Sequence, residues 1–343
     1  MKKQAKSICV FLTILLIFVD TITVFAANTQ TSKNTTGTAK QTENIKGVWL
    51  SYVDQQMYLK GKEKREYDET FDSICKTAKK YGLNTIFVHV RSHNDAIYPS
   101  EIYPWSSEML NGTDPGFNPL VDMVGIAHKN NLKIHAWINP YGYRNGNIYG
   151  DASLATENNI AAGVEEILDL YAVDGIHFDD YFPPAGAKTI NSMVHRVHEI
   201  CEERRRIFGI APQGNIDNCL AAGADVKTWL SQKGYIDYIA PQIYWTDNYG
   251  ADGGTTMSSD RLKAWKELNT AGITMYVGMA LYRAGSPSAS DRGWSLATDN
   301  LSRQYKKAKS LGYEGYIIYN TASIIEPNAS MVTELSGLTK SEN

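Results

Sequence analysis

Residues 174–182 of the 343-residue chain read DGIHFDDYF. Ile176 and Phe178 alternate with His177 and Asp179, the pattern of a strand that has one apolar face and one polar face. In a closed α/β barrel the apolar side chains face the surrounding helices and the alternate side chains point into the lumen. The stretch therefore predicts a barrel strand that ends on two adjacent carboxylates, Asp179 and Asp180.

Seven other β-branched and aromatic runs repeat this pattern along the chain. Together the eight runs are 47–53, 84–91, 133–140, 175–182, 208–214, 235–245, 274–282 and 313–320, and helical patterns separate them at 67–80, 119–131, 157–171, 189–207 and 295–311. Eight β/α units in about 290 residues have the count and length of a (β/α)8 TIM barrel. The alternative is a doubly wound open sheet, which would require a glycine-rich phosphate loop that the chain lacks.

The N-terminal residues predict export. A lysine-rich start is followed by an apolar run over 8–19, as in a signal peptide. The alternative, a membrane anchor, is disfavoured because Asp20 interrupts the run and the run is too short to span a bilayer. We expect no integral membrane segment after cleavage. The predicted division is a signal peptide (1–26), a flexible linker (27–45), a barrel (46–338) and a short tail (339–343).

Polar residues are expected to gather at one end of the barrel. The strand alternation places the following side chains in the lumen: His89, Arg91, His135, Trp137, Asn139, His177, Asp179, Tyr181, Gln213, Gln242 and Tyr244. They lie toward the C-terminal ends of five strands, where barrel enzymes build their active sites. The alternative is a polar network that only seals the barrel.

Paired carboxylates favour glycoside hydrolysis, in which one carboxyl group protonates the leaving oxygen and the other acts as nucleophile or activates water. We expect Asp179 to be the nucleophile or base and Asp180 to be the second carboxylate, since adjacent carboxylates raise each other's pKa. Asp95 and Asp247 follow the second and sixth runs, so either could supply the proton or bind sugar hydroxyls. No cofactor is expected.

A wider set of residues is expected to bind the polysaccharide or to position the carboxylates. It comprises Arg91, Asp95, His135, Trp137, Asn139, Tyr141, His177, Tyr181, Gln242, Tyr244, Trp245 and Asn320. The net charge of −3 gives no reason to expect a nucleic-acid partner. Two alternatives stay open: a metal-dependent polysaccharide hydrolase or deacetylase with His135, His177 and Asp179 as ligands, and a non-catalytic glycan-binding barrel.

Five motifs in order carry a resemblance. They are GVWL at 47–50, VR at 90–91 with DAIYPS at 95–100, HAWINP at 135–140, DGIHFDDYF at 174–182 and DYIAPQIYW at 237–245. Together they resemble the bacterial glycosyl-hydrolase-like family 10. The resemblance implies a TIM barrel, export and hydrolysis of an envelope glycan, and one member of the family hydrolyses denuded peptidoglycan, whose glycan strands have lost their stem peptides.

The fourth run, with its FDDY motif, is also similar to that of the α-amylase and α-galactosidase clans, where the residue aligned with Asp179 is the nucleophile. The chain departs from these patterns in two ways. The stretch after residue 184 is short, and Gln213 stands where the amylase-like clans place their acid. Both departures concern the identity of the acid and the depth of the cleft.

Overall fold

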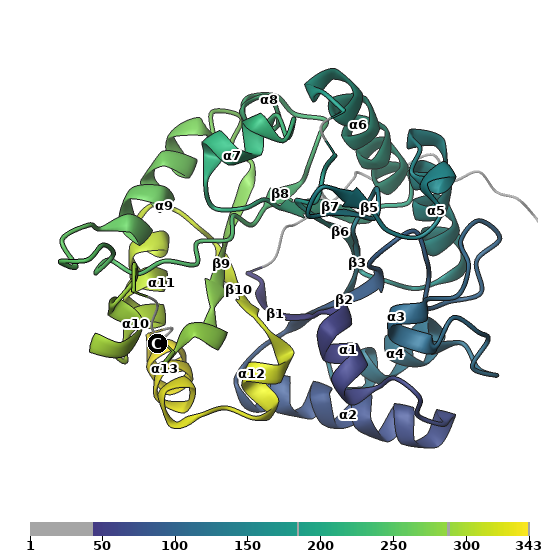
Figure 1. Cartoon of the computed structure of the whole chain (residues 1–343), viewed down its shortest axis with the longest axis horizontal. Coiled ribbons are helices and arrows are strands. Elements are labelled where there is room, and N and C mark those ends of the chain that lie inside the picture. Colours follow the sequence, from purple (N-terminus) through teal and green to yellow (C-terminus); the bar gives the residue numbers. More distant parts are fainter. Residues whose placement is uncertain (1–43, 184, 287–288, 342–343) are drawn as a thin grey trace, which may run out of the picture. The chain divides into compact units, whose positions relative to one another are not determined.

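Eight parallel strands form a closed barrel surrounded by helices (Figure 1). The computed structural model describes residues 44–183, 185–286 and 289–341. The predicted signal peptide and nearly all of the predicted linker lie outside these residues. Within them, no helix combines the length and the apolar character needed to cross a membrane.

The barrel strands follow one another around the barrel in chain order, and the last strand pairs with the first. They are β1 (Lys46–Leu50), β2 (Thr85–Arg91), β3 (Lys133–Ile138), β6 (Gly175–Asp179), β7 (Ile207–Ala211), β8 (Tyr238–Ile239), β9 (Thr274–Ala280) and β10 (Gly315–Tyr319). Each overlaps one of the eight predicted runs, so the predicted TIM barrel is confirmed. Outside the barrel, β4 (Tyr143–Arg144) and β5 (Asn147–Ile148) form a small antiparallel hairpin after β3.

Helices connect successive strands and form the outer layer (Figure 1). They are α1 (Tyr52–Tyr58), α2 (Lys64–Lys80), α3 (Ser107–Leu110), α4 (Pro119–Lys129), α5 (Glu157–Leu170), α6 (Ala187–Glu203), α7 (Ile216–Ala221), α8 (Val226–Ser231), α9 (Met257–Leu268), α10 (Gly293–Leu296), α11 (Asn300–Ser310), α12 (Thr321–Ile325) and α13 (Ala329–Lys340), with 3-10 turns η1 (Ala152–Leu154) and η2 (Leu281–Arg283). Helix α13 continues past residue 338, into the predicted tail.

The buried side chains form two separate clusters, as a barrel requires. The outer cluster, between strands and helices, contains the residues predicted to face outward on the fourth strand, Ile176 and Phe178. The inner cluster fills the lumen with large rings such as Trp49, Phe87 and Tyr238. The lumen is therefore a packed core below the pocket that opens at one end.

Glycines on neighbouring strands make room for these rings. A Cβ atom added to Gly209 would lie 2.3 Å from the ring of Tyr238, and one added to Gly47 would lie 2.6 Å from the ring of Phe87. Carbon atoms in contact prefer separations of about 3.5 to 4 Å. A large ring on one strand therefore occupies the space that a glycine leaves on the next.

A hydrogen-bonded chain crosses the lumen. The indole N–H of Trp49 can only donate, and it donates to Nε2 of His177 over 3.0 Å. His177 therefore carries its proton on Nδ1 and donates it to the Tyr238 hydroxyl over 2.8 Å. The Tyr238 hydroxyl in turn donates to Nδ1 of His135 over 3.2 Å. Burial lowers the pKa of His135 to about 4 and that of His177 well below its usual range, so both rings are neutral.

Candidate active site

A pocket of about 210 Å³ opens at the C-terminal ends of the barrel strands. Asp179, Ala211 and Tyr319, the last residues of β6, β7 and β10, all line it. Five of the predicted site residues line this pocket: Trp137, Asp179, Tyr181, Gln242 and Tyr244. These five residues, predicted from different strands, thus meet in one pocket, which is the candidate active site.

Asp179 is held firmly at this pocket. Its side chain is only 5% exposed. The side-chain amide of Gln242 donates to Asp179 Oδ1 over 3.1 Å and to the carbonyl of Ala211 over 2.9 Å. The backbone N–H of Asp180 also donates to Asp179 Oδ1, over 2.9 Å. Among the described residues that line the pocket, Asp179 is the only carboxylic acid.

Asp179 and Asp180 titrate as a pair. Burial, and then the charge of Asp180, raises the pKa of Asp179 well above its usual range. Burial also raises the pKa of Asp180, whose Oδ2 accepts from the backbone N–H of Gln213 over 2.8 Å. Each carboxyl group shifts the pKa of the other. The pair therefore keeps one proton to a higher pH than an isolated aspartate would.

His89 also lines the pocket; the sequence predicted only that it faces the lumen and gave it no catalytic or binding role. Its ring stacks on Trp137 with centroids 3.5 Å apart and planes 12° apart. The backbone N–H of Tyr52 donates to His89 Nδ1 over 3.2 Å, so Nε2 carries the proton and donates to Asn139 Oδ1 over 3.1 Å. Burial lowers the pKa of His89 to about 3, so the ring is neutral. Asn139 thus orients His89 and does not line the pocket.

Arg144 is the other notable residue missed by the sequence reasoning. It belongs to the β4–β5 hairpin and lines the pocket from outside the barrel. The hairpin strands have only two residues each, too few for strand periodicity to reveal them. Trp49, Ser51, Tyr52, Val53, Ala211 and Tyr319 complete the lining.

Arg91 corrects the prediction that its side chain faces the lumen. A register shift between His89 and Arg91 breaks the alternation of β2. The Arg91 guanidinium lies outside the barrel, stacked 3.4 Å from the centroid of the Tyr103 ring and close to Gly163 of α5. Arg91 is fully buried there. It cannot reach a sugar in the pocket.

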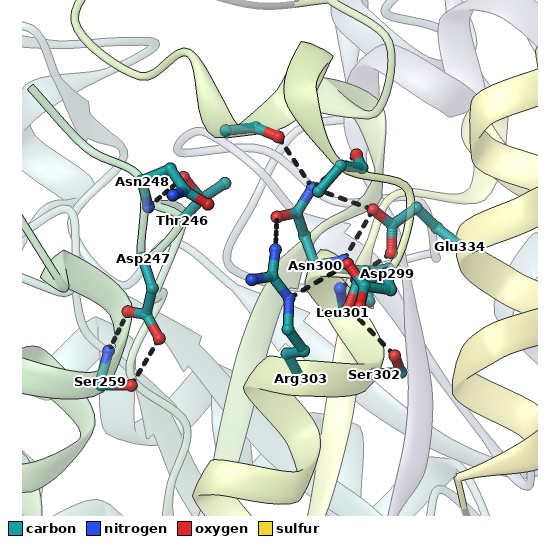
Figure 2. A network of polar contacts seen from close by, with 12 residues as sticks. Thr246, Asp247, Asn248, Ser259, Asp299, Asn300, Leu301, Ser302, Arg303 and Glu334 are labelled. Carbon is teal, nitrogen blue, oxygen red and sulfur yellow. Dashed lines mark hydrogen bonds and ion pairs between the residues drawn. The ribbon is translucent and has the colours of Figure 1, made fainter. Parts of the chain in front are cut away.

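Asp247, the predicted alternative acid, also lies elsewhere. Its two carboxylate oxygens accept from the backbone N–H and the hydroxyl of Ser259, over 2.7 and 2.6 Å, in the first turn of α9 (Figure 2). Trp245 lies beside it in a separate small cavity and contacts Arg261 of α9 through its ring. Both residues therefore contact α9 and not the pocket. At this point the backbone no longer follows the direction of the barrel strand.

Five other predicted residues do not line the pocket. His135 and His177 belong to the hydrogen-bonded chain in the lumen. Asp95 accepts from the backbone N–H of His93, and Tyr141 packs edge-on against Phe182. Asn320 follows the pocket residue Tyr319, but its amide donates to Asp54. None of these five residues lines the pocket.

The proposed metal ligands do not converge. Both ring nitrogens of His177 are engaged, by Trp49 and by Tyr238. In the part of the chain that the structure describes, no three or more His, Cys, Asp or Glu side chains are grouped so as to hold a metal ion. His135, His177 and Asp179 therefore do not form a metal centre.

The chain is similar to known glycosyl hydrolases. The family model described as glycosyl hydrolase-like 10 matches residues 44–147 and 186–296. Identity is 28% to glycosyl hydrolase YngK of Bacillus subtilis (strain 168), over 90% of this chain and 73% of YngK. It is 26% to glycosyl hydrolase DigH of Escherichia coli (strain K12), over 77% of this chain and 79% of DigH.

The fold is also found in the spore cortex-lytic enzyme SleL of Bacillus megaterium QM B1551, with a TM-score of 0.52 and 11% identity over 87% of this chain and 74% of SleL. The segment with Asp179 and Asp180 lies between the two stretches matched by the family model. Those stretches cover more than half of the chain. The protein therefore belongs to the glycosyl hydrolase-like 10 family and is a glycosidase.

Proposed function

We propose that this glycosidase is exported and hydrolyses glycosidic bonds in the glycan strands of the bacterial envelope, with denuded peptidoglycan as its substrate. The observation that carries the proposal is the state of Asp179, a buried acid in the pocket whose pKa is raised by burial and by Asp180. A glycosidase requires such an acid to protonate the leaving oxygen.

In this proposal Asp179 gives its proton to the leaving oxygen as the glycosidic bond breaks, and the water molecule that attacks the anomeric carbon returns a proton to the carboxylate. The pair retains one proton, and Asp179 is the member that lines the pocket. Asp180 does not line the pocket, and its charge raises the pKa of Asp179, so in this proposal Asp180 serves to keep Asp179 protonated. This role for Asp179 differs from that of the nucleophile or base expected from the sequence.

The substrate and the location of the enzyme are further parts of the proposal. The pocket is lined by the aromatic residues Trp49, Tyr52, Trp137, Tyr244 and Tyr319, a residue class that suits stacking on sugar rings. The N-terminal lysines and the apolar run at 8–19 have the form of a signal peptide. An exported glycosidase of this family meets the wall glycan outside the cytoplasm, as the family resemblance implies.

The experiment compares the wild type with the Asp179→Asn variant on purified glycan strands, with and without stem peptides. Soluble products are identified by mass spectrometry. We expect the wild type to release oligosaccharides with new reducing ends from denuded strands. The variant should lose about 10²- to 10⁴-fold in rate, the usual contribution of a general acid.

The matched control is Asp247→Asn, which removes a carboxylate outside the pocket. Circular dichroism verifies that each variant is folded. Full activity in a folded Asp179→Asn variant would remove Asp179 from the reaction. Absence of products from every wall glycan with the wild type would refute the proposed substrate.

A further inference from the structure

Arg144 is a cation at the pocket that forms no ion pair with a carboxylate of the described residues. It extends from β4, and among the described residues that line the pocket it is the only lysine or arginine. Its Nε is buried and has no hydrogen-bond partner among the described residues. Its guanidinium lies over the ring of Tyr52, 5.5 Å from the centroid. An arginine held in this way has N–H groups available for a ligand.

Two arginines outside the pocket are instead paired with carboxylates. Arg65 pairs with Glu69 over 2.9 Å, and Arg204 pairs with Asp169 over 2.7 Å. The buried N–H of Arg144 carries a desolvation cost that a bound acceptor would remove. Guanidinium groups match carboxylates in geometry, because two parallel N–H groups can meet the two oxygens.

The position of Arg144 relative to Asp179 suits one bound sugar. Both residues line the same pocket, together with Tyr181. Both also act on the Tyr181 hydroxyl, because the charge of Asp179 raises its pKa and that of Arg144 lowers it. Tyr181 is therefore within electrostatic range of both residues. A substituent of a sugar bound at Asp179 can be directed toward Arg144.

We propose that Arg144 binds a carboxylate carried by the sugar in the pocket and thereby selects acidic glycans. This inference rests on the proposed function and deepens it. In peptidoglycan the carboxylate is that of the lactyl ether on N-acetylmuramic acid. It is free and charged when the stem peptide is absent, and it is an uncharged amide when the peptide is attached. Recognition by Arg144 would therefore favour denuded strands.

The test measures a ratio of kcat/KM values for two substrates. One is denuded strands with free lactyl carboxylates, and the other is the same strands with these groups converted to methylamides. We expect the wild type to favour the free carboxylates by about 10- to 100-fold, the size of a hydrogen bond to a charged group. In the Arg144→Gln variant the ratio of the two kcat/KM values should fall to about one, mainly because KM rises for the strands with free carboxylates. Arg65→Gln, which removes an exposed arginine on α2, should keep the wild-type ratio and rate.

Two results would overturn the inference. One is a wild type that cleaves both substrates equally well. The other is an Arg144→Gln variant that loses rate on both substrates in the same proportion, since that indicates a structural role. A third substrate, a polymer with uronic acid carboxylates, identifies the source of the carboxylate. Equal cleavage of this polymer would support carboxylate binding but overturn the assignment to the lactyl group.

A binding measurement separates this inference from the proposed function. If the wild type cleaves no wall glycan, the proposed function fails. Calorimetry with denuded and methylamidated strands then decides the inference alone. Binding that requires both the free carboxylate and Arg144 would support it. The inference would be overturned if the strands do not bind, or if binding is unchanged when the carboxylate is amidated or when Arg144 is replaced.

Discussion

Replacing Tyr238 by phenylalanine removes one buried oxygen from the chain of hydrogen bonds in the lumen. That oxygen accepts from His177 Nδ1 over 2.8 Å and donates to His135 Nδ1 over 3.2 Å. His177 cannot respond by moving its proton, because Nε2 must stay free to accept from Trp49. One buried N–H is therefore left without a partner, at about 1 to 3 kcal/mol. His135 can shift its proton between its nitrogens, so it loses about one ordinary hydrogen bond. The total is about 2 to 4 kcal/mol of unfolding free energy.

Equilibrium unfolding in urea, followed by tryptophan fluorescence, measures this loss as a shift in the midpoint at constant slope. The matched control is Tyr98→Phe, since Tyr98 is fully buried and its hydroxyl has no hydrogen-bond partner in the described structure. We expect that variant to stay within about 1 kcal/mol of the wild type. Equal losses of unfolding free energy in the two variants would refute the hydrogen-bonded chain in the lumen. Both variants remove one buried tyrosine hydroxyl, and only that of Tyr238 has hydrogen-bond partners among the described residues.

Two further predictions concern the pocket and its surroundings. The Gln242 amide favours the ionised form of Asp179, so Gln242→Leu should raise the pKa of Asp179 further. Because the reaction requires protonated Asp179, the alkaline limb of the kcat/KM profile should move to higher pH, and a downward shift would contradict the assignment of the acid. Asp247→Ala should cost about 0.5 to 2 kcal/mol of stability through the lost cap on α9, measured by urea unfolding. The activity of this variant should stay within about twofold of the wild type, because substitutions away from the pocket change the free energy by only about 0.5 kcal/mol apart from the lost cap. A folded but inactive variant would instead identify Asp247 as the acid.

The barrel could be predicted because its physical requirement repeats on every strand. A residue that faces the helices must be apolar, and alternation then assigns the next residue to the lumen. Ile176 and Phe178 on one face, and His177 and Asp179 on the other, follow this rule. The rule does not say how far along the axis a side chain lies. His177 was therefore expected at the sugar, although it lies in the packed lumen.

The site residues that could not be predicted lie where the alternation ends. The irregularity between His89 and Arg91 is a backbone feature without a sequence signal such as glycine, and it moves Arg91 to the outside of the barrel. Arg144 reaches the pocket from a hairpin in the loop after β3. Asp247 follows the sixth run closely in sequence, but its contact with Ser259 depends on where α9 begins. Each of these positions depends on tertiary packing and not on local periodicity.

The place of Asp179 follows from the neighbouring strands as well as from its own sequence. The family model stops at residue 147 and resumes at 186, so β6 lies in the unmatched segment. Its neighbours β3 and β7 lie in the two matched stretches and pair with β6 along its length, with Asp179 opposite Ala211. The barrel thus determines where Asp179 lies and buries it, which is the largest cause of its raised pKa, and Asp180 raises that pKa further while Gln242 lowers it. Since Gln242 acts on Asp179 through a side-chain hydrogen bond and not through the strand pairing, Gln242→Leu can change the pH dependence of the reaction while β6 stays in register.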